Sequence, residues 1–306
     1  MLTEIFFELD EFCLEYQDYF SHYQLRASFR PGAIRGRKPE LCLSEVMAIV
    51  VYYPLTYYQN FKRYYTEHVL KDLTGEFPNL VSYGRMTELI KGCLHPLLLY
   101  LTWKARRNHC TGISYVDSAK LIACHPKRAH QHKVMKGLAE WGKTSVGWFY
   151  GIKYHLVISH LGEILNFAVT SGSTSDNNLE VLKSLTENIS GKLFGDKGYL
   201  INKKKRETIE RGGELKLITK VRKNMKKPIL AADDSCWLNK RGVVESAINI
   251  QKEILGIEHT RHRSPWNALT HLVAGLVAYD FRERKPSTSI SLKYLAEKSS
   301  AVKTAA

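Results

Sequence analysis

The sequence lacks the features that mark membrane proteins and disulfide-rich secreted proteins. Its six cysteines are scattered through 306 residues without a Cys-x-x-Cys pair, which excludes a disulfide framework and favours a reducing compartment. The N-terminus is acidic and amphipathic, unlike the basic start and apolar centre of a signal peptide. The most apolar runs, 46–55 and 266–281, are shorter than the ~20 residues that span a bilayer. These absences predict a cytoplasmic protein with no membrane partner.

Acidic residues are scarce relative to basic ones. The chain has 45 Lys and Arg against 30 Asp and Glu, a formal net charge of +15 at pH 7. With 44% hydrophobic and 25% charged residues, the composition is otherwise that of a globular chain long enough for two domains. Such a basic surplus is typical of proteins that bind a polyanion, most often nucleic acid. A merely soluble basic protein is the alternative that composition leaves open.

Residues 1–105 have the periodicity of short helices and no strand-like alternation, which predicts an all-helical N-terminal domain. Helices are expected at 45–53, 57–73 and 83–93, with Ser44 and Ser82 as N-caps of the first and third. Their outer faces carry Arg and Lys, which suits a helix-turn-helix-like DNA-binding unit. A plain helical bundle that covers the next domain is an equally good interpretation.

Between residues 106 and 285 the pattern changes to strands alternating with helices, followed by a solvated tail at 286–306. We expect five strands, at 112–118, 146–159, 163–170, 192–196 and 215–221. The covering helices are expected at 176–189 (with Asp176 as its cap), 203–211, 242–255 and 266–281. This order predicts an α/β domain with a mixed five-stranded sheet.

Two acidic residues follow apolar strand segments, Asp117 in Tyr-Val-Asp-Ser and Asp196 in Phe-Gly-Asp-Lys. An acid at the end of an apolar strand is costly to desolvate unless something binds it. Two such acids repel when they are brought together, unless a divalent cation neutralises them. Mg²⁺ held by carboxylates is the usual solution for phosphodiester chemistry. Each Asp alone is better explained as a turn former or a helix cap, but together on a basic chain they indicate a metal site.

A third acid, Glu245, lies between two cations at helical spacing. Arg241 precedes it by four residues and Lys252 follows it by seven, so all three share one helix face. This pattern fits a metal ligand with two phosphate-binding neighbours, or a solvated ladder of ion pairs. Asp233 and Asp234 are the rival third carboxylates, and their turn-like surroundings predict that they are solvated.

With these residues in hand, the sequence resembles the DDE transposases of bacterial insertion sequences. Their signature around the Glu, Y-x2-R-x3-E-x6-K, is matched at Arg241, Glu245 and Lys252, with Leu238 in place of the Tyr. The segments 128–134, 147–156 and 81–85 narrow the resemblance to insertion-sequence family 982. The resemblance covers residues 40 to 285.

The resemblance implies an RNase H-like catalytic domain at 106–285 with an acidic triad of Asp117, Asp196 and Glu245. Two Mg²⁺ ions, or Mn²⁺ ions in their place, would be held by this triad. The implied activity is cleavage of double-stranded DNA at the element's terminal inverted repeats and transfer of the cut strand to target DNA. Joining two ends implies at least a homodimer in the DNA complex. The resemblance also implies a bacterial cytoplasmic enzyme that is associated with the nucleoid when it is bound to DNA.

Basic and aromatic side chains are interleaved between the first two predicted strands. Phosphate contact is the expected role of Lys127, Arg128, His130, His132 and Lys133. A zinc site made by Cys124, His125, His130 and His132 is disfavoured by their spacing. Trp141, Trp148, Phe149 and Tyr150 suit stacking on unpaired bases, although Trp148 or Tyr150 is also explained as a core residue of the strand.

Two further basic features point to DNA. Lys153 and His155 share one strand face, so they either border the metals or lie on a solvated face. Residues 201–227 contain eleven Lys or Arg and three acids, a second candidate DNA-binding surface.

The alternatives to a transposase are a nuclease without strand transfer and a non-catalytic DNA-binding protein derived from a transposase. The presence of three acids and both flanking cations disfavours the last.

Overall fold

The computed structural model describes residues 1–20, 41–108, 110–144, 146–226, 228–258 and 262–289. The chain divides into two compact units, one formed by residues 1–104 with 250–283 and the other by residues 105–249 with the segment from 284 onward. The sequence assigns 250–283 to the catalytic domain, whereas the structure packs this segment among the N-terminal helices. Its long helix is buried along most of its length, from Thr270 to Asp280, and therefore needs neighbours on every side.

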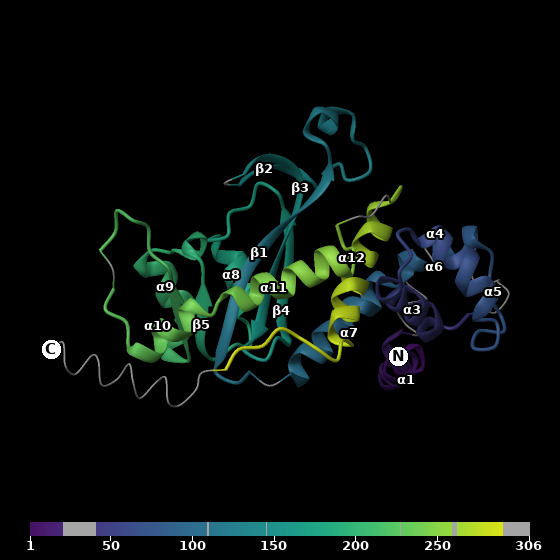
Figure 1. Ribbon diagram of the computed structural model, residues 1–306, viewed down its shortest axis with the longest axis horizontal. Helices are drawn as coiled ribbons and strands as arrows, with labels where there is room; N and C mark the ends of the chain where they lie inside the picture. Colours follow the sequence, from purple (N-terminus) through teal and green to yellow (C-terminus); the bar gives the residue numbers. More distant parts are fainter. Residues whose placement is uncertain (21–40, 109, 145, 227, 259–261, 290–306) are drawn as a thin grey trace. The chain divides into compact units, whose positions relative to one another are not determined.

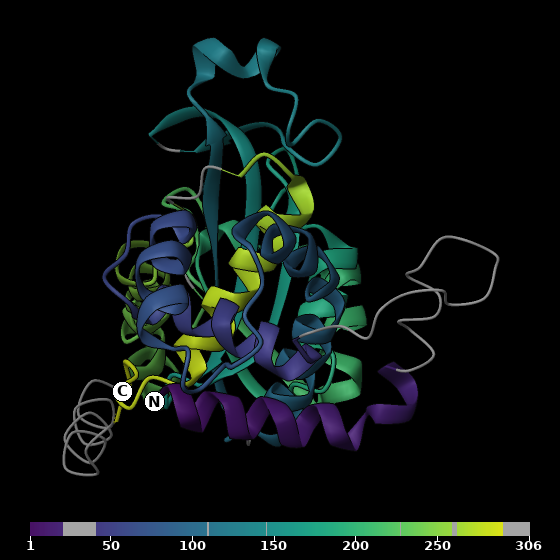
Figure 2. The ribbon, with the colours of Figure 1, turned by 90° about the vertical axis from the view of Figure 1, so that its right-hand side faces the viewer.

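The first unit is helical in the part of the chain that the structure describes (Figure 1). Its helical elements are α1 (Leu2–Glu15), α3 (Leu43–Tyr52), η1 (Tyr53–Leu55), α4 (Phe61–Arg63), η2 (Tyr64–Val69), α5 (Leu70–Asp72), α6 (Tyr83–Gly92), α7 (Leu94–Arg107), η6 (Ile250–Ile254) and α12 (Pro265–Asp280). Helix α12 packs against α3 and α6, and the long α1 packs against α3 (Figure 2).

Two of the expected helix starts differ from the structure. The helix predicted from residue 57 begins at Phe61, because Asn60 accepts the backbone N–H of Arg63 at 2.9 Å and caps it. Ser44 does not cap α3. Its hydroxyl donates to Asp10 at 2.6 Å, and Cys42 is the N-cap. Ser82 caps α6, as predicted.

The second unit is built on a six-stranded mixed sheet. Its strands are β1 (Ile113–Cys124), β2 (Glu140–Thr144), β3 (Gly147–Ser159), β4 (Ile164–Ser171), β5 (Gly191–Gly195) and β6 (Leu215–Thr219). The order is β2-β3-β1-β5-β6, with β4 also pairing β3. Pairs β1–β3, β2–β3 and β3–β4 are antiparallel, whereas β1–β5 and β5–β6 are parallel.

The prediction of a mixed α/β sheet is confirmed, but the count of five strands is wrong. The strand missing from the prediction is β2. It has only five residues, and Glu140, Gly142 and Lys143 interrupt any apolar alternation. It pairs with β3 through the backbone, at Glu140↔Gly151 through Thr144↔Gly147.

Helices lie against the sheet of the second unit. These are α8 (Leu179–Thr186), α9 (Lys203–Glu210), α10 (Ala232–Asn239) and α11 (Gly242–Asn249), with short turns η3 (Pro126–Gln131), η4 (Lys197–Tyr199) and η5 (Arg211–Gly213). Val116 and Val157 are register partners, and they pack with Leu182 of α8 and Ile209 of α9 in one buried cluster. Since neighbouring strand residues point to opposite faces, Asp117 faces away from that cluster. Helix α11 crosses β1 and contacts it (Figure 1).

The expected solvated tail is ordered where the structure describes it. The backbone N–H of Thr288 donates to the carbonyl of His160 at 2.8 Å, and its hydroxyl lies 3.4 Å from the hydroxyl of Tyr115. Residues 286–289 therefore line the β3–β4 turn, and 290–306 lie outside the described residues. Across the described ranges, no helix has the length and apolar character that a membrane crossing requires.

Candidate active site

Three carboxylates of the second unit gather around one guanidinium group. Nη2 of Arg241 lies 2.6 Å from Oε1 of Glu245 and 3.9 Å from Oδ1 of Asp196. Nη1 of Arg241 lies 3.8 Å from Oδ2 of Asp117. The side chain of Arg241 is only 15% exposed. Residues more than a hundred positions apart in the sequence therefore meet at a single cation.

Strand register explains how the two aspartates meet. Strands β1 and β5 are parallel, and their last paired positions are Val116 and Gly195. Asp117 follows Val116 and Asp196 follows Gly195, so both aspartates lie where β5 ends. The prediction that Asp117 closes its strand is wrong, because β1 continues to Cys124 alongside β3. The carboxylate of Asp117 reaches the site because the neighbouring strand β5 ends beside it.

Glu245 joins the aspartates from α11. Arg241 stands directly before this helix, and the two side chains form an i,i+4 ion pair. On the other side of the helix Val244, Ala247 and Ile248 are buried. That apolar side anchors the helix and keeps Glu245 and Arg241 on its free face.

Burial raises the pKa of Asp117 to about 6. Hydrogen bonding by the backbone N–H of Ser118, at 2.8 Å, and the charge of Arg241 oppose this rise. The carboxylates of Glu245 and Asp196 add to it, because like charges disfavour ionisation. Burial therefore makes the ionised form of Asp117 less favourable than that of an exposed aspartate.

The donor atoms suit a hard metal ion in kind. All three side chains offer carboxylate oxygens, the ligands that Mg²⁺ prefers. Within the described ranges, no three His, Cys, Asp or Glu side chains stand close enough to one another to hold a metal ion. The guanidinium of Arg241 is the cation that the three carboxylates contact.

Asp233 and Asp234 have different partners. Nζ of Lys192 lies 2.8 Å from Asp233 and 2.6 Å from Asp234, and Nζ of Lys216 lies 3.2 Å from Asp234. These residues open α10 rather than a turn, and the expected solvation is wrong for Asp234, whose side chain is 2% exposed, whereas that of Asp233 is 42% exposed. The pair neutralises lysines of β5 and β6.

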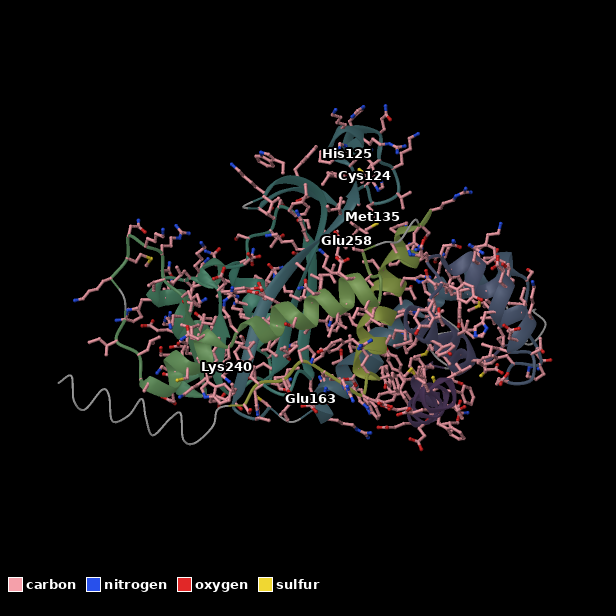
Figure 3. The ribbon with its side chains drawn as sticks, viewed as in Figure 1. Cys124, His125, Met135, Glu163, Lys240 and Glu258 are labelled. Atoms are coloured by element: carbon pink, nitrogen blue, oxygen red, sulfur yellow. The ribbon has the colours of Figure 1, made fainter. Side chains whose placement is uncertain are left out.

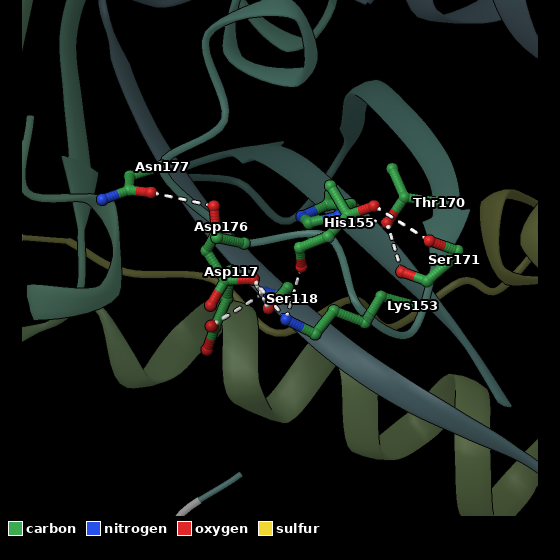
Figure 4. A network of polar contacts seen from close by, with 10 residues as sticks. Asp117, Ser118, Lys153, His155, Thr170, Ser171, Asp176 and Asn177 are labelled. Atoms are coloured by element: carbon green, nitrogen blue, oxygen red, sulfur yellow. Dashed lines mark hydrogen bonds and ion pairs between the residues drawn. The ribbon is translucent and has the colours of Figure 1, made fainter. Parts of the chain in front are cut away.

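Asp176 has a role that the sequence did not predict (Figure 4). Expected to cap a helix, it instead accepts hydrogen bonds at Oδ1 from the hydroxyl of Ser118 at 2.9 Å and from Nζ of Lys153 at 3.2 Å. Asn178 caps α8, accepting the backbone N–H groups of Glu180 and Val181. The cap lies two positions after the predicted one, because periodicity alone did not locate the start of the helix.

Lys153 and His155 lie on the sheet face opposite to Asp117. His155 pairs in register with Ser118, the neighbour of Asp117, and therefore shares the face of Asp176. Lys153 is 12% exposed and also donates to the carbonyl of Thr174 at 2.9 Å. His155 is buried, lies 3.0 Å from the hydroxyl of Thr170, and burial lowers its pKa to about 4. Both side chains are thus engaged inside the protein.

The candidate phosphate contacts between β1 and β2 are mostly exposed. Lys127, Arg128 and His130 lie on η3 and Lys133 follows it, all exposed, whereas His132 is half-buried with its ring near Tyr150. This segment extends beyond the far end of β1 (Figures 1 and 2). Cys124 and His125 lie at its start (Figure 3), and the possible zinc set is not assembled.

Two tryptophan side chains of the β2–β3 hairpin are exposed to solvent. Trp141 is 44% exposed and Trp148 is 61% exposed, with Nζ of Lys143 5.5 Å from the Trp148 ring centroid. The expected stacking role of Phe149 is wrong, because this residue, between Trp148 and Tyr150, is buried. Trp148 is therefore not a core residue.

Lys252 belongs to the first unit, whereas Glu245 belongs to the second. Nζ of Lys252 lies 2.7 Å from Oε2 of Glu258, and Lys252 sits in the π-helical turn η6 rather than in a regular α-helix. The i+7 spacing that placed it on the face of Glu245 assumes α-helical geometry throughout.

A family model described as Transposase DDE domain matches residues 107–265. The match spans slightly more than half of the chain and contains Asp117, Asp196, Arg241 and Glu245. No curated protein and no solved structure matches. On the family match, the chain belongs to the transposases with a DDE domain.

Proposed function

We propose that this protein is the transposase of a bacterial insertion sequence related to family 982, and that Asp117, Asp196 and Glu245 are its catalytic acids. The RNase H-like fold implied by the resemblance is part of the proposal. One observation carries it: a family match to a DDE domain coincides with three carboxylates that converge on one site from β1, β5 and α11.

The three carboxylates would hold two Mg²⁺ ions, or Mn²⁺ in their place. Bound there, the ions would stabilise the charge that develops on the attacking and leaving oxygens of a phosphodiester. Ser118 orients Asp117 through its backbone N–H, and Asp176 in turn fixes the hydroxyl of Ser118. Arg241 would bind a phosphate next to the reacting bond, for which its planar guanidinium is well suited.

DNA would be bound by basic surfaces outside the site. Lys127, Arg128, His130 and Lys133 are exposed and can neutralise phosphates, as can the basic tract at 201–227. His132, Lys153, His155 and Lys252 have protein neighbours, so we assign them a supporting rather than a direct role. The helices of residues 1–105 would recognise the terminal repeats, and a homodimer would bring two ends together in the bacterial nucleoid.

The proposal is tested with linear duplexes that end in the inverted repeats flanking the gene. Purified protein with Mg²⁺ should nick these ends and join the freed 3′-hydroxyl to a target plasmid, and Asp117→Asn should do neither. Cleavage without joining would identify a nuclease instead. Binding of the ends without any cleavage in Mg²⁺ or Mn²⁺ would identify a non-catalytic DNA-binding protein.

A further inference from the structure

Arg241 is held at the site by charge more than by hydrogen bonds. Its only close contact with the three acids is Nη2 to Glu245 at 2.6 Å, and the approaches to Asp117 and Asp196 are 3.8 and 3.9 Å. Nε and Nη1 are buried and have no hydrogen-bond partner. A buried N–H without a partner costs free energy. The guanidinium is therefore neutralised here without being well satisfied.

The carboxylate oxygens that contact Arg241 are also the oxygens that would bind a divalent cation at this site. A divalent ion that ligates Asp117, Asp196 and Glu245 must approach them to about 2.0–2.1 Å if it is Mg²⁺. A guanidinium 2.6 Å from Glu245 occupies one of these oxygens and repels the incoming charge. The two cations therefore compete for the negative charge of the same carboxylates.

We propose that Arg241 is a resident competitor of the divalent cation, which must displace it from the three carboxylates. This inference rests on the proposed function and adds to it a reason why metal binding is weak before DNA is bound. In the absence of DNA, Arg241 keeps metal affinity low. Where a DNA phosphate is present, the displaced guanidinium gains a bidentate acceptor, so metal loading is favoured when substrate is bound.

The test measures metal binding by full-length protein without DNA. Mn²⁺ is titrated calorimetrically into the wild type, Arg241→Gln and a control, Arg63→Gln. The control removes an i,i+4 Arg–Glu pair of the same kind, with Arg63 67% exposed and bound to Glu67. We expect Arg241→Gln to bind Mn²⁺ about 5–150-fold more tightly than the wild type, the usual range of a coupling between sites. Arg63→Gln should match the wild type.

A measurement on the wild type guards against a variant that fails to fold. In a ¹⁵Nε spectrum of the arginine side chains, the Arg241 signal should shift as Mg²⁺ is added, whereas the Arg63 signal should not. Unchanged or weaker Mn²⁺ binding by Arg241→Gln, or an Arg241 signal that ignores Mg²⁺, would overturn the inference.

Two more variants separate this inference from the proposed function. If Asp117→Asn and Glu245→Gln weaken Mn²⁺ binding while Arg241→Gln does not strengthen it, the metal site stands and only the competition is refuted. If Asp117→Asn and Glu245→Gln leave Mn²⁺ binding unchanged, the metal is not held by these carboxylates. The assigned site and the inference are then both refuted.

Discussion

Substitution of Glu245 and of Asp234 should have opposite effects on activity and stability. Both acids follow the last strand of the sheet in the sequence, and both changes, Glu245→Gln and Asp234→Asn, keep the side chain's shape while removing its charge. Glu245 contacts the cation shared with Asp117 and Asp196, whereas Asp234 contacts two lysines of the sheet. Only one of them can be the third catalytic carboxylate.

The structure sets the expected stability changes. The side chain of Glu245 is 48% exposed, so loss of its ion pair should change the free energy of unfolding by less than about 1 kcal/mol. Asp234 is 2% exposed and paired with Lys192 and Lys216. Breaking a buried pair costs about 3–5 kcal/mol when the remaining charge is stranded. These lysines are 30% and 60% exposed and stay partly hydrated, so we expect about 2 kcal/mol, or roughly 6 °C in Tm.

Activity should change in the reverse order. A metal that loses a charged ligand loses several kcal/mol of transition-state stabilisation, and about 3 kcal/mol corresponds to ~10²-fold in rate. Mg²⁺-dependent cleavage by Glu245→Gln should therefore fall at least ~10²-fold, while DNA binding without metal stays close to that of the wild type. Asp234→Asn should cleave at nearly the wild-type rate per folded molecule.

The two measurements are made on the same preparations, thermal unfolding by circular dichroism and single-turnover cleavage of an end duplex well below Tm. A folded, inactive Asp234→Asn beside an active Glu245→Gln would refute the assignment of the third carboxylate. An Asp234→Asn variant as stable as the wild type would refute the reasoning from burial.

Three further outcomes follow from the structure. Asp176→Asn should lower the free energy of unfolding by about 1–3 kcal/mol because it strands Lys153, which is 12% exposed, and Lys153→Met should recover part of the loss in the double variant; additive losses in urea unfolding would contradict the pairing. Burial lowers the pKa of His262 from 6.5 to about 4, and that of the neighbouring His271 is also lowered. Between pH 4 and pH 6.5 the unfolded chain binds more protons than the folded one, so the free energy of unfolding is highest above pH 6.5 and falls as the pH approaches 4, by about 3 kcal/mol for His262. His262→Phe should flatten this dependence of the free energy of unfolding on pH, and an unchanged dependence would exclude His262 as its source. DNA affinity should fall log-linearly with salt because the net charge is +15, and an affinity that is the same at low and physiological salt in fluorescence anisotropy would count against phosphate-dominated binding.

Local patterns in the sequence were sufficient for the strands that carry the site. The segments around Asp117 and Asp196 are apolar and β-prone, and the strands formed there. The i,i+4 spacing of Arg241 and Glu245 predicted a shared helix face, and the two side chains form an ion pair. The strands predicted at 146–159 and 163–170 also formed, as the antiparallel pair β3–β4. Each of these features depends on neighbours within about ten positions, which periodicity and turn chemistry can detect.

Long-range pairing decided the rest. The parallel register of β1 and β5 brings Asp117 beside Asp196, and no local pattern encodes which strands become neighbours or where one stops alongside another. Asp176 reaches Ser118 and Lys153 across a loop, and Asp234 is buried only because lysines of β5 and β6 lie next to it. Composition and periodicity set which residues prefer strand, helix or solvent. The sites at which distant charges meet were set by packing, because an ion pair between remote residues gains its energy only after the chain has paid the entropy of bringing them together.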